Sequence, residues 1–239
     1  MLIGGLQKTT LIDYPGKVAC TVFLVGCNFR CPWCYSSELV LPEKIKKLPK
    51  MTERDFFKFL KDRQSLLDGV VLCGGEPTLN QDLPEFVKKI KKLGFLVKLD
   101  TNGSNSKMLK RLIREKLINY IAMDIKAPIA AKIQNPKSKY QKATGVKVNL
   151  KDIRKSIKII KNSGVEYEFR TTCVPGIHSR EDILQIARNI APARAYFLQS
   201  FRPEKTLNSK LEKVRPYPRQ FLSEIKKEIG SAFRVCEIR

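Results

Sequence analysis

Three closely spaced cysteines are the residues of this sequence best suited to chemistry. They are Cys27, Cys31 and Cys34, in a C-x3-C-x2-C spacing directly after an apolar run, 18–25, that predicts a buried strand. Gly26 and Pro32 allow the chain to turn tightly, so the three thiols can converge. Convergent thiolates select zinc, copper(I) or an iron–sulfur cluster. A structural zinc site or an ordinary ferredoxin cluster takes four protein ligands. Because this loop supplies three, the spacing favours a 4Fe–4S cluster with one iron open to a small molecule.

Polar motifs recur further along the chain, each where a predicted strand ends. They are Gly74, Gly75, Glu76 and Pro77 after the run 70–73, Asp100, Thr101, Asn102 and Gly103 after 95–99, and Asp124 and Lys126 at the end of 120–126. Glycines allow the backbone to approach a ligand closely, and a carboxylate can bind an ammonium group. Taken alone, each motif is also ordinary turn chemistry.

An arginine in the apolar run 165–173 also requires a partner. Arg170 is predicted to bind a substrate carboxylate, because guanidinium binds carboxylates with two parallel hydrogen bonds. An ion pair with Glu168 is the weaker alternative, since alternate strand residues point the same way. Gln199 and Phe201 can line the same cavity, with core packing as the alternative for Phe201. The single histidine, His178, is interpreted as an ordinary loop residue.

These motifs together resemble the radical S-adenosylmethionine (radical SAM) superfamily, including the aromatic Trp33 before the third cysteine. The resemblance implies one 4Fe–4S cluster held by Cys27, Cys31 and Cys34, with S-adenosylmethionine (SAM) on the open iron. The segment 74–77 is then expected to bind the SAM amino group. The segment 100–102 with Asp124 and Lys126 is expected around the SAM carboxylate, together with a possible monovalent cation.

Within that superfamily, the sequence is most similar to glycyl-radical-activating enzymes, in particular to activating proteins of anaerobic ribonucleoside-triphosphate reductase. The shared pattern includes residues 11–17, 23–34, 74–77 and 100–103, whereas Tyr35 and Ser36 depart from the histidine and asparagine that are frequent there. The resemblance implies reductive cleavage of SAM to a 5′-deoxyadenosyl radical, which installs a glycyl radical on a partner enzyme. Reduced flavodoxin or ferredoxin is the implied electron donor.

Repeated strand–helix units must bring these residues together. Helices are predicted at about 53–67, 82–93, 106–117, 150–163, 179–190 and 217–229, and the strands between them include 195–199. This alternation predicts an α/β fold with a parallel sheet. Six units predict a partial (β/α)6 TIM-type barrel, whose site lies at the carboxyl ends of the strands. We expect one domain over 1–239, with 1–17 as a lead-in, 36–52 irregular, and 203–239 as an extension packed on the barrel.

Composition limits the classes of function. The chain has 239 residues and a net charge of +23, and no apolar run is long enough to cross a membrane. The remaining cysteines, Cys20, Cys73, Cys173 and Cys236, are predicted to be buried free thiols, which suits the cytoplasm. The positive charge fits solvated helix faces better than a nucleic-acid surface.

Two alternatives remain at this point. The same radical chemistry could modify a nucleotide or tRNA, which the positive charge would suit. Alternatively, the three cysteines could form a zinc knuckle, completed by Cys20, Cys73 or His178, in a nucleic-acid-binding module.

Overall fold

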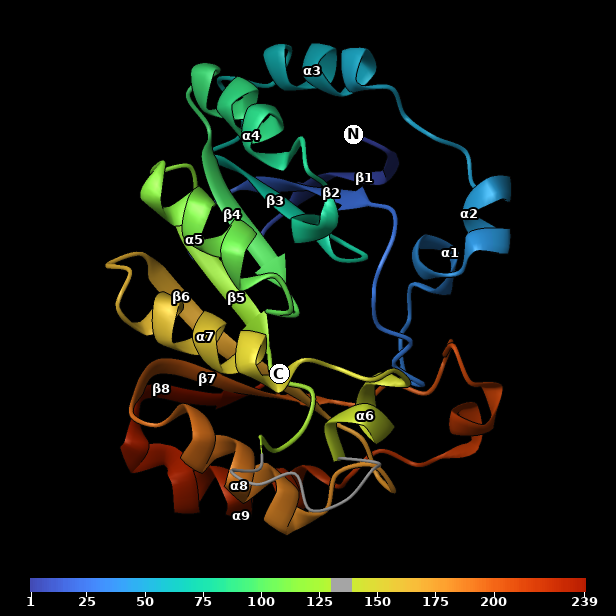
Figure 1. Cartoon of the computed structure of the whole chain (residues 1–239), viewed down its shortest axis with the longest axis vertical. Helices are drawn as coiled ribbons and strands as arrows, with labels where there is room; N and C mark the ends of the chain where they lie inside the picture. The colour runs from blue at the N-terminus through green and yellow to red at the C-terminus, as the bar shows by residue number, and fades with distance from the viewer. Residues whose placement is uncertain (130–138) are drawn as a thin grey trace.

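A single eight-stranded sheet organises the computed structural model, which describes residues 1–129 and 139–239. The strands follow one another in space in chain order (Figure 1). They are β1 (Ile3–Thr10), β2 (Ala19–Leu24), β3 (Gly69–Gly74), β4 (Leu96–Thr101), β5 (Tyr120–Asp124), β6 (Glu166–Cys173), β7 (Ala193–Ser200) and β8 (Phe233–Ile238). Strands β2 to β8 are mutually parallel, whereas β1 runs antiparallel to β2.

The sheet forms a partial barrel, as predicted. Within the described part of the chain, β1 and β8 are its two edges and do not pair with each other. Because the connected strands are parallel, their carboxyl ends lie at one rim, where catalytic groups of barrels gather. The predicted site motifs follow β2, β3, β4 and β5, so they are brought to that rim.

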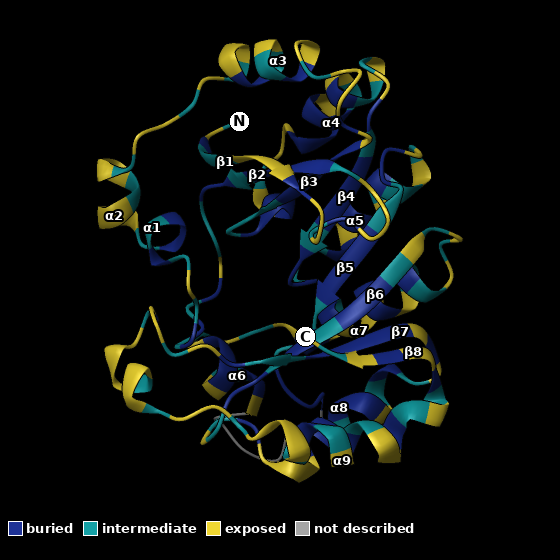
Figure 2. Ribbon diagram, turned by 180° about the vertical axis from the view of Figure 1, so that it is seen from behind, coloured by how far each residue is buried: buried dark blue, intermediate teal, exposed yellow. Residues whose placement is uncertain are grey.

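The longer helices cover the outer face of the sheet (Figure 1). The α-helices are α1 (Ser37–Val40), α2 (Pro42–Lys47), α3 (Glu53–Lys61), α4 (Leu83–Lys92), α5 (Ser106–Arg114), α6 (Lys139–Thr144), α7 (Leu150–Lys161), α8 (Arg180–Ile190) and α9 (Arg219–Ile229); the short 3-10 helices are η1 (Pro77–Leu79), η2 (Ser209–Lys213) and η3 (Gly230–Ala232). The helices keep exposed residues on their outer side, while the strands are largely buried (Figure 2). Among the described residues, no helix is both long and apolar enough to span a membrane.

Side chains near the helix starts fix several boundaries. Thr52 accepts a hydrogen bond from the Asp55 amide at the start of α3, and Ser179 forms a reciprocal capping box with Asp182 at the start of α8. Ser and Thr oxygens satisfy the free amides of a first helical turn. Asn105 and Asn149 cap α5 and α7 in the same way.

Several elements differ from the prediction. The lead-in contains β1, the segment 203–239 contains β8, the segment predicted as irregular contains α1 and α2, and no helix was predicted where α6 lies. Gly4 and Gly5 weaken the strand signal of β1, since glycine is disfavoured in strands. Helices α1 and α2 are too short to show a helical period. The sheet therefore has seven parallel strands where six were predicted.

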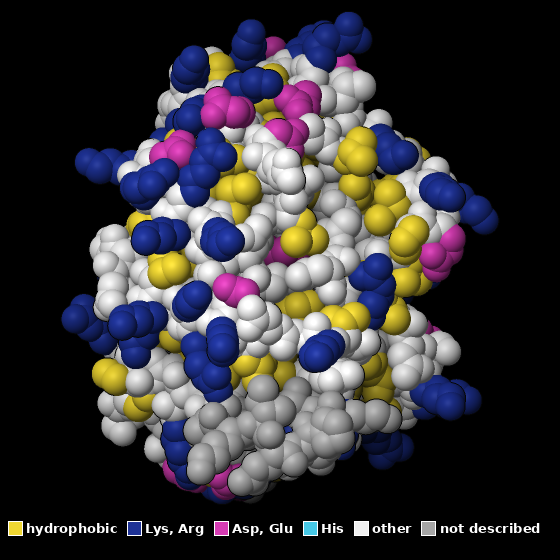
Figure 3. Space-filling view, in the orientation of Figure 1, with side chains coloured by type: hydrophobic (Ala, Val, Ile, Leu, Met, Phe, Trp, Pro, Cys, Tyr) yellow, Lys and Arg dark blue, Asp and Glu magenta, His cyan; other side chains and the backbone are white. Residues whose placement is uncertain are grey.

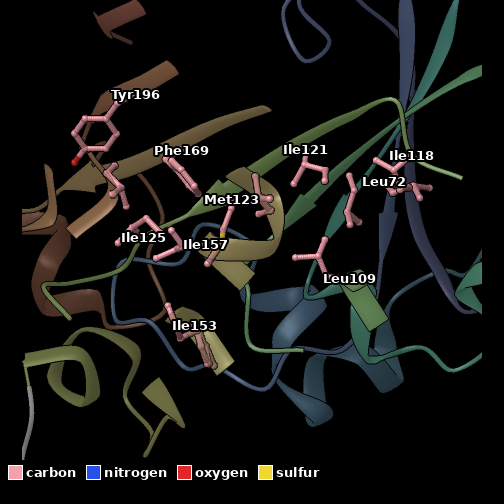
Figure 4. Packing of buried hydrophobic residues seen from close by; sticks show 14 of the residues in the cluster. Leu72, Leu109, Ile118, Ile121, Met123, Ile125, Ile153, Ile157, Phe169 and Tyr196 are labelled. Atoms are coloured by element: carbon pink, nitrogen blue, oxygen red, sulfur yellow. The ribbon is translucent and has the colours of Figure 1, made fainter. Parts of the chain in front are cut away.

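Different groups of residues pack on the two faces of the sheet. Val70 and Leu72 belong to the large apolar cluster between sheet and helices (Figure 4), whereas Val71 packs with Tyr14 and Ala19 in a small separate cluster. Alternate strand residues point to opposite faces, so this second cluster lies inside the barrel. It fills only part of that interior, and charged side chains described below line the rest.

Positive charge is spread over the surface. Figure 3 shows Lys and Arg side chains scattered across this face rather than gathered in one patch. On this face, the scatter fits solvated helix faces better than a single nucleic-acid-binding patch.

Candidate active site

A cavity of about 410 Å³ lies at the carboxyl ends of the strands. It is lined by Cys27, Cys31, Cys34, Gly74, Gly75, Glu76, Asp100, Thr101, Asn102, Asp124, Lys126, Arg170 and Gln199, among others. This set includes every predicted cofactor- or metal-binding residue except Pro77, which is buried at the start of η1. Phe201 is also buried, in the core rather than on the cavity wall. A hollow of similar volume on the outer surface between α7 and α8 contains none of the predicted residues.

The cysteine loop is held in place by its own neighbours. Arg30 donates from Nη1 to the carbonyl oxygens of Cys27 (2.7 Å) and Phe29 (2.8 Å), so its guanidinium closes the first turn of the loop. Phe29 and Trp33 are both buried and anchor the loop to the protein. Gly26 has φ +93°, a left-handed conformation that glycine adopts without strain. The loop is therefore shaped before any metal binds.

The three thiols differ from exposed cysteines. Burial raises the pKa of Cys27 to about 11 and that of Cys31 to about 12, and it also raises the pKa of Cys34. Burial favours the protonated thiol, whereas iron binds the thiolate. Their protonation therefore depends on metal binding.

The zinc alternative finds no support in the geometry. Among residues 1–129 and 139–239, no three His, Cys, Asp or Glu side chains lie close enough together to hold a single metal ion. A cubane cluster has a different requirement, because each cysteine binds a different iron. Cys20 lies in the main apolar cluster, and both ring nitrogens of His178 have backbone partners.

The glycines of the segment 74–77 bring two loops into contact. The Gly75 amide donates to the Leu24 carbonyl and the Glu76 amide donates to the Gly26 carbonyl, both at 2.8 Å. A Cβ atom on Gly75 would lie 2.0 Å from the Gly26 carbonyl oxygen, which no side chain allows. The predicted close approach of the glycine backbone is therefore observed, but the neighbour is the cysteine loop rather than a ligand. This docking sets the position of the cysteine loop against β3.

The Glu76 side chain points into the protein. It is fully buried, and its carboxylate accepts hydrogen bonds from the Thr78 amide and hydroxyl, the Thr101 hydroxyl (2.7 Å) and the Asn102 amide (2.6 Å). Burial raises the pKa of this carboxyl even though four donors favour the ionised form. Glu76 thus joins the loop after β3 to the loop after β4. The resemblance implies that the segment 74–77 binds the SAM amino group. Because the Glu76 carboxylate is bound within the protein, the backbone of this segment would make that contact.

Asn102 links the β4 loop to the first cysteine. Its side-chain nitrogen, Nδ2, donates to Asn28 Oδ1 (3.0 Å) and lies 4.0 Å from Cys27 Sγ. The Phe29 amide also donates to that sulfur, at 3.4 Å. Hydrogen bonds to ligand sulfurs stabilise their negative charge and tune a cluster's reduction potential. Asn102 is therefore placed to affect Cys27 directly.

Two carboxylates at the ends of β4 and β5 are bound to cations of the protein itself. Lys98 donates to Asp100 Oδ1, and Lys126 donates to Asp124 Oδ2 at 3.0 Å. Burial opposes ionisation of both aspartates, but Arg170 and the two lysines outweigh it. The pKa of Asp100 stays below its usual range, and that of Asp124 falls to about 2. Both are ionised at neutral pH.

Arg170 has different partners from the predicted ones. Its Nε donates to Asp124 Oδ1 (2.8 Å) and its Nη1 donates to Asp100 Oδ2 (3.0 Å), so its guanidinium is engaged by protein carboxylates rather than left for a substrate. Glu168 is 3.8 Å away, consistent with its being the weaker partner. The alternation along β6 correctly predicted a weak pairing with Glu168. It gave no sign of Asp100 and Asp124, which lie on neighbouring strands.

Sequence reasoning did not find the remainder of this charged interior. Glu168 accepts hydrogen bonds from Tyr120 (2.9 Å) and, through two donors, from Arg239. Arg239 also stacks over the Phe197 ring. The available signal was alternation: Lys98 shares a face with Asp100 on one strand, and Glu168 shares a face with Arg170 on another. Arg239 gave no such signal, because β8 was not predicted.

His178 has a defined position rather than that of a free loop residue. Its Nδ1 accepts from the Val174 amide (3.1 Å), so Nε2 carries the proton and donates to the Lys126 carbonyl (2.8 Å). The ring packs edge-on against Trp33. His178 thus connects the backbone of Lys126 to the cysteine loop: it lies in a loop, as interpreted, but it is buried and holds that loop in place.

Comparison with known proteins identifies the family. The model of the radical SAM superfamily matches residues 21–190, which contain the cysteine loop and β2 to β6. The chain belongs to the radical SAM superfamily. The radical SAM match covers every predicted metal and cofactor residue, and it favours a cluster over the zinc knuckle for the cysteines.

Two relatives and one solved structure illustrate the similarity of this radical SAM chain. A protein of Methanocaldococcus jannaschii, whose name as a glycyl-radical enzyme activating enzyme is itself provisional, is 34% identical over 225 residues, covering 92% of this chain and 87% of its own. The anaerobic ribonucleoside-triphosphate reductase-activating protein of Escherichia coli is 28% identical over 83 residues, 35% of this chain and 53% of its own. The structure of Streptococcus suis SuiB bound to its precursor peptide SuiA has a TM-score of 0.63 at 13% identity over 90% of this chain and 49% of that one, which shows a shared fold.

The residues present fit the groups that radical SAM proteins bind. Three thiols face one cavity, and the described residues supply no further side chains that close a single-ion site with them. Opposite them, Lys126 offers an ammonium group that Asp124 holds in place. Soft sulfur donors and a cation for a carboxylate match a 4Fe–4S cluster and SAM in chemical type.

Proposed function

We propose that this radical SAM enzyme installs a glycyl radical on a partner enzyme, such as an anaerobic ribonucleotide reductase. The observation that carries the proposal is the match over 92% of the chain to a relative provisionally named as such an activating enzyme. The shorter match to the reductase-activating protein supports the same reaction. The partner, its glycine and the electron donor are part of the proposal, with reduced flavodoxin or ferredoxin as the donor.

The bound groups supply the radical, and the protein supplies their position. When bound, a reduced 4Fe–4S cluster and SAM would supply one-electron chemistry, the reductive cleavage of SAM to methionine and a 5′-deoxyadenosyl radical able to take a hydrogen atom from a glycine. Cys27, Cys31 and Cys34 would hold three irons and leave the fourth for SAM. Lys126 would bind the SAM carboxylate, and the backbone at 74–75 would bind its amino group.

The cavity wall also limits water around the reacting groups. Phe29, Trp33 and Val40 are buried residues on the side of the cysteine loop. Apolar walls keep a reactive radical away from solvent and hold the reacting atoms close together. The opposite wall carries Thr172 and Gln199, which sit side by side on β6 and β7. That polar wall is where a peptide or another substrate would lie.

The cysteine assignment is tested by a single substitution. Cys31→Ala should prevent assembly of the cluster on anaerobic reconstitution and abolish reductive cleavage of SAM. Cys236→Ala is the matched control, because Cys236 lies on β8 and does not line the cavity. Visible absorption, iron content and 5′-deoxyadenosine release measure the outcome. A Cys31→Ala protein that still cleaves SAM would show that the ligand assignment is wrong.

The substrate assignment requires a separate experiment. The reconstituted, reduced protein with SAM is mixed anaerobically with a purified anaerobic ribonucleotide reductase, and electron paramagnetic resonance is recorded. A glycyl radical signal that needs the activase, SAM and reductant together supports the proposal. Turnover of SAM stimulated by a nucleotide or tRNA, with no radical on the reductase, would favour the alternative that this enzyme modifies nucleotides or RNA.

A further inference from the structure

The guanidinium of Arg170 lies between the two aspartates at the floor of the cavity. Asp100 ends β4, Asp124 ends β5 and Arg170 lies on β6, so three neighbouring strands meet at one ion-pair cluster. Arg170 is 2.8 Å from Asp124 Oδ1 and 3.0 Å from Asp100 Oδ2. Its side chain is 12% exposed and that of Asp100 is 13% exposed. These contacts are largely shielded from solvent, where ion pairs are strong.

Every carboxylate oxygen of this cluster has a cationic partner. Asp100 Oδ1 accepts from Lys98 and Oδ2 from Arg170; Asp124 Oδ1 accepts from Arg170 and Oδ2 from Lys126. The neighbouring Thr101 hydroxyl is also engaged, because it donates to Glu76 and accepts from the Gly103 amide. Each carboxylate oxygen that the resemblance offers to a monovalent cation therefore already has a cationic donor of the protein.

The charges around the cluster oppose a further cation. Two carboxylates face three cationic side chains, and the next carboxylate, Glu168, is bound mainly to Arg239. A sodium or potassium ion would have to displace a hydrogen-bonded guanidinium or ammonium group at a partly shielded site, where the Asp124 side chain is 26% exposed. Oxygen ligands with free lone pairs are what such hard cations require. The residues present do not fit the cation that the resemblance implies.

We propose that Arg170 takes the place of a bound monovalent cation, as a positioning residue that holds Asp100 and Asp124 together for the cofactor site. Through Asp124 it fixes Lys126, the residue assigned to the SAM carboxylate. The site then needs no sodium or potassium ion. This inference rests on membership of the radical SAM superfamily and on the proposed role of Lys126. It holds whether the substrate is a partner enzyme or a nucleotide or tRNA.

The test compares cations on the protein without its cluster. Thermal unfolding of the wild type is measured in sodium, potassium and choline chloride at equal ionic strength. We expect the same melting temperature in all three salts. Arg170→Gln keeps hydrogen-bond donors but removes the charge, and we expect a lower melting temperature in choline that sodium or potassium selectively raises. Arg188→Gln, which removes a surface ion pair with Glu181, is the control and should respond equally to all three salts.

A second measurement locates the ion directly. Crystals of both proteins soaked in rubidium chloride are examined for anomalous density between Asp100 and Asp124. Density is expected in Arg170→Gln and not in the wild type. With the cluster reconstituted, SAM affinity of Arg170→Gln should be about tenfold weaker in choline than in potassium, the effect of losing one charged hydrogen bond.

Three outcomes would overturn the inference. They are cation-selective stabilisation of the wild type, a rubidium ion between the two aspartates in the wild type, and an Arg170→Gln protein that folds but shows no cation-selective response. If Arg170→Gln does not fold, Arg170→Lys serves instead, because its single ammonium group reaches fewer carboxylate oxygens. None of these results depends on glycyl-radical formation, so failure of the proposed function would be seen separately.

Discussion

The carboxylate of Glu76 holds the β3 and β4 loops together from inside the protein. It accepts four hydrogen bonds and has no contact with solvent. Buried carboxylates need such partners, because an unpaired buried charge is strongly unfavourable. Glu76 therefore shapes the cavity wall, in addition to any contact that it makes with a ligand.

Replacing Glu76 by Gln should destabilise the protein. The NH2 group of Gln would replace one of the two oxygens and so face either the Thr78 amide or the Asn102 amide, leaving a buried donor unpaired. We expect a loss of about 2 kcal/mol in the free energy of unfolding, measured by urea denaturation. Glu85→Gln on the surface of α4 is the control, with a change within about 0.5 kcal/mol. A Glu76→Gln protein as stable as the control would mean that this clamp is dispensable.

His178 should make stability depend on pH. Burial lowers its pKa from 6.5, while the hydrogen bond to the Lys126 carbonyl and the charge of Asp182 oppose that shift and the Lys126 charge supports it. The folded state therefore holds a neutral ring, and the unfolded chain takes up the proton. Stability is complete above about pH 6.5 and falls as the pH drops below it, with a limiting slope of about 1.4 kcal/mol per pH unit.

The pH effect is measured by urea unfolding between pH 5 and 8. His178→Phe removes the single histidine and should flatten the slope in this range, although the protein loses two hydrogen bonds. An unchanged slope in His178→Phe would assign the pH dependence to other groups.

At the scale of elements, the cap of α8 has a measurable share in stability. Ser179 accepts from the Asp182 amide while Asp182 accepts from the Ser179 amide. Ser179→Ala should lower the free energy of unfolding by about 1 kcal/mol, because the Asp182 amide in the first turn loses its side-chain acceptor. Ser209→Ala, an exposed serine at the start of η2, should change it by less than about 0.5 kcal/mol. Equal effects of the two substitutions would contradict the capping role.

The sequence predicted the elements that carry a long or strong pattern. The apolar runs before the cysteine loop and before Gly74 gave β2 and β3, and helical periodicity gave the helices that cover them. Strand β8 and helices α1 and α2 were missed, because short elements show too few repeats of their period. The ends of the predicted strands nevertheless placed the site at the correct rim.

The partners within the site were not predictable to the same extent. Cys27, Cys31 and Cys34 follow each other in sequence, so their shared location could be inferred. The pairing of Arg170 with Asp100 and Asp124 depends on the register of three strands, which periodicity does not supply. The inward direction of Glu76 depends on a loop conformation that no pattern encodes.

At the scale of the whole molecule, β8 carries an interior charge pair. Arg239 donates twice to Glu168, a fully buried carboxylate on β6. Arg239→Ala should lower the free energy of unfolding by about 2 kcal/mol, since the buried carboxylate loses its main cation, and partial exposure of Arg239 limits the effect. Urea denaturation measures it, with the exposed Arg234→Ala on the same strand as control. A loss no greater than that of the control would show that Tyr120 and Arg170 suffice for Glu168.

Over the described residues the sheet does not close on itself, and this affects how far the opening of the site can widen. Around that mouth, the loop after β2 meets the loop after β7 through three contacts: Arg202 N to Tyr35 Oη, Lys205 to Glu38, and Asn208 N to the Pro32 carbonyl. Separating two hydrogen-bonded strands would require many bonds to break together, whereas these contacts can release one at a time. A bulky protein segment could thus be admitted by parting two loops while every strand stays in register.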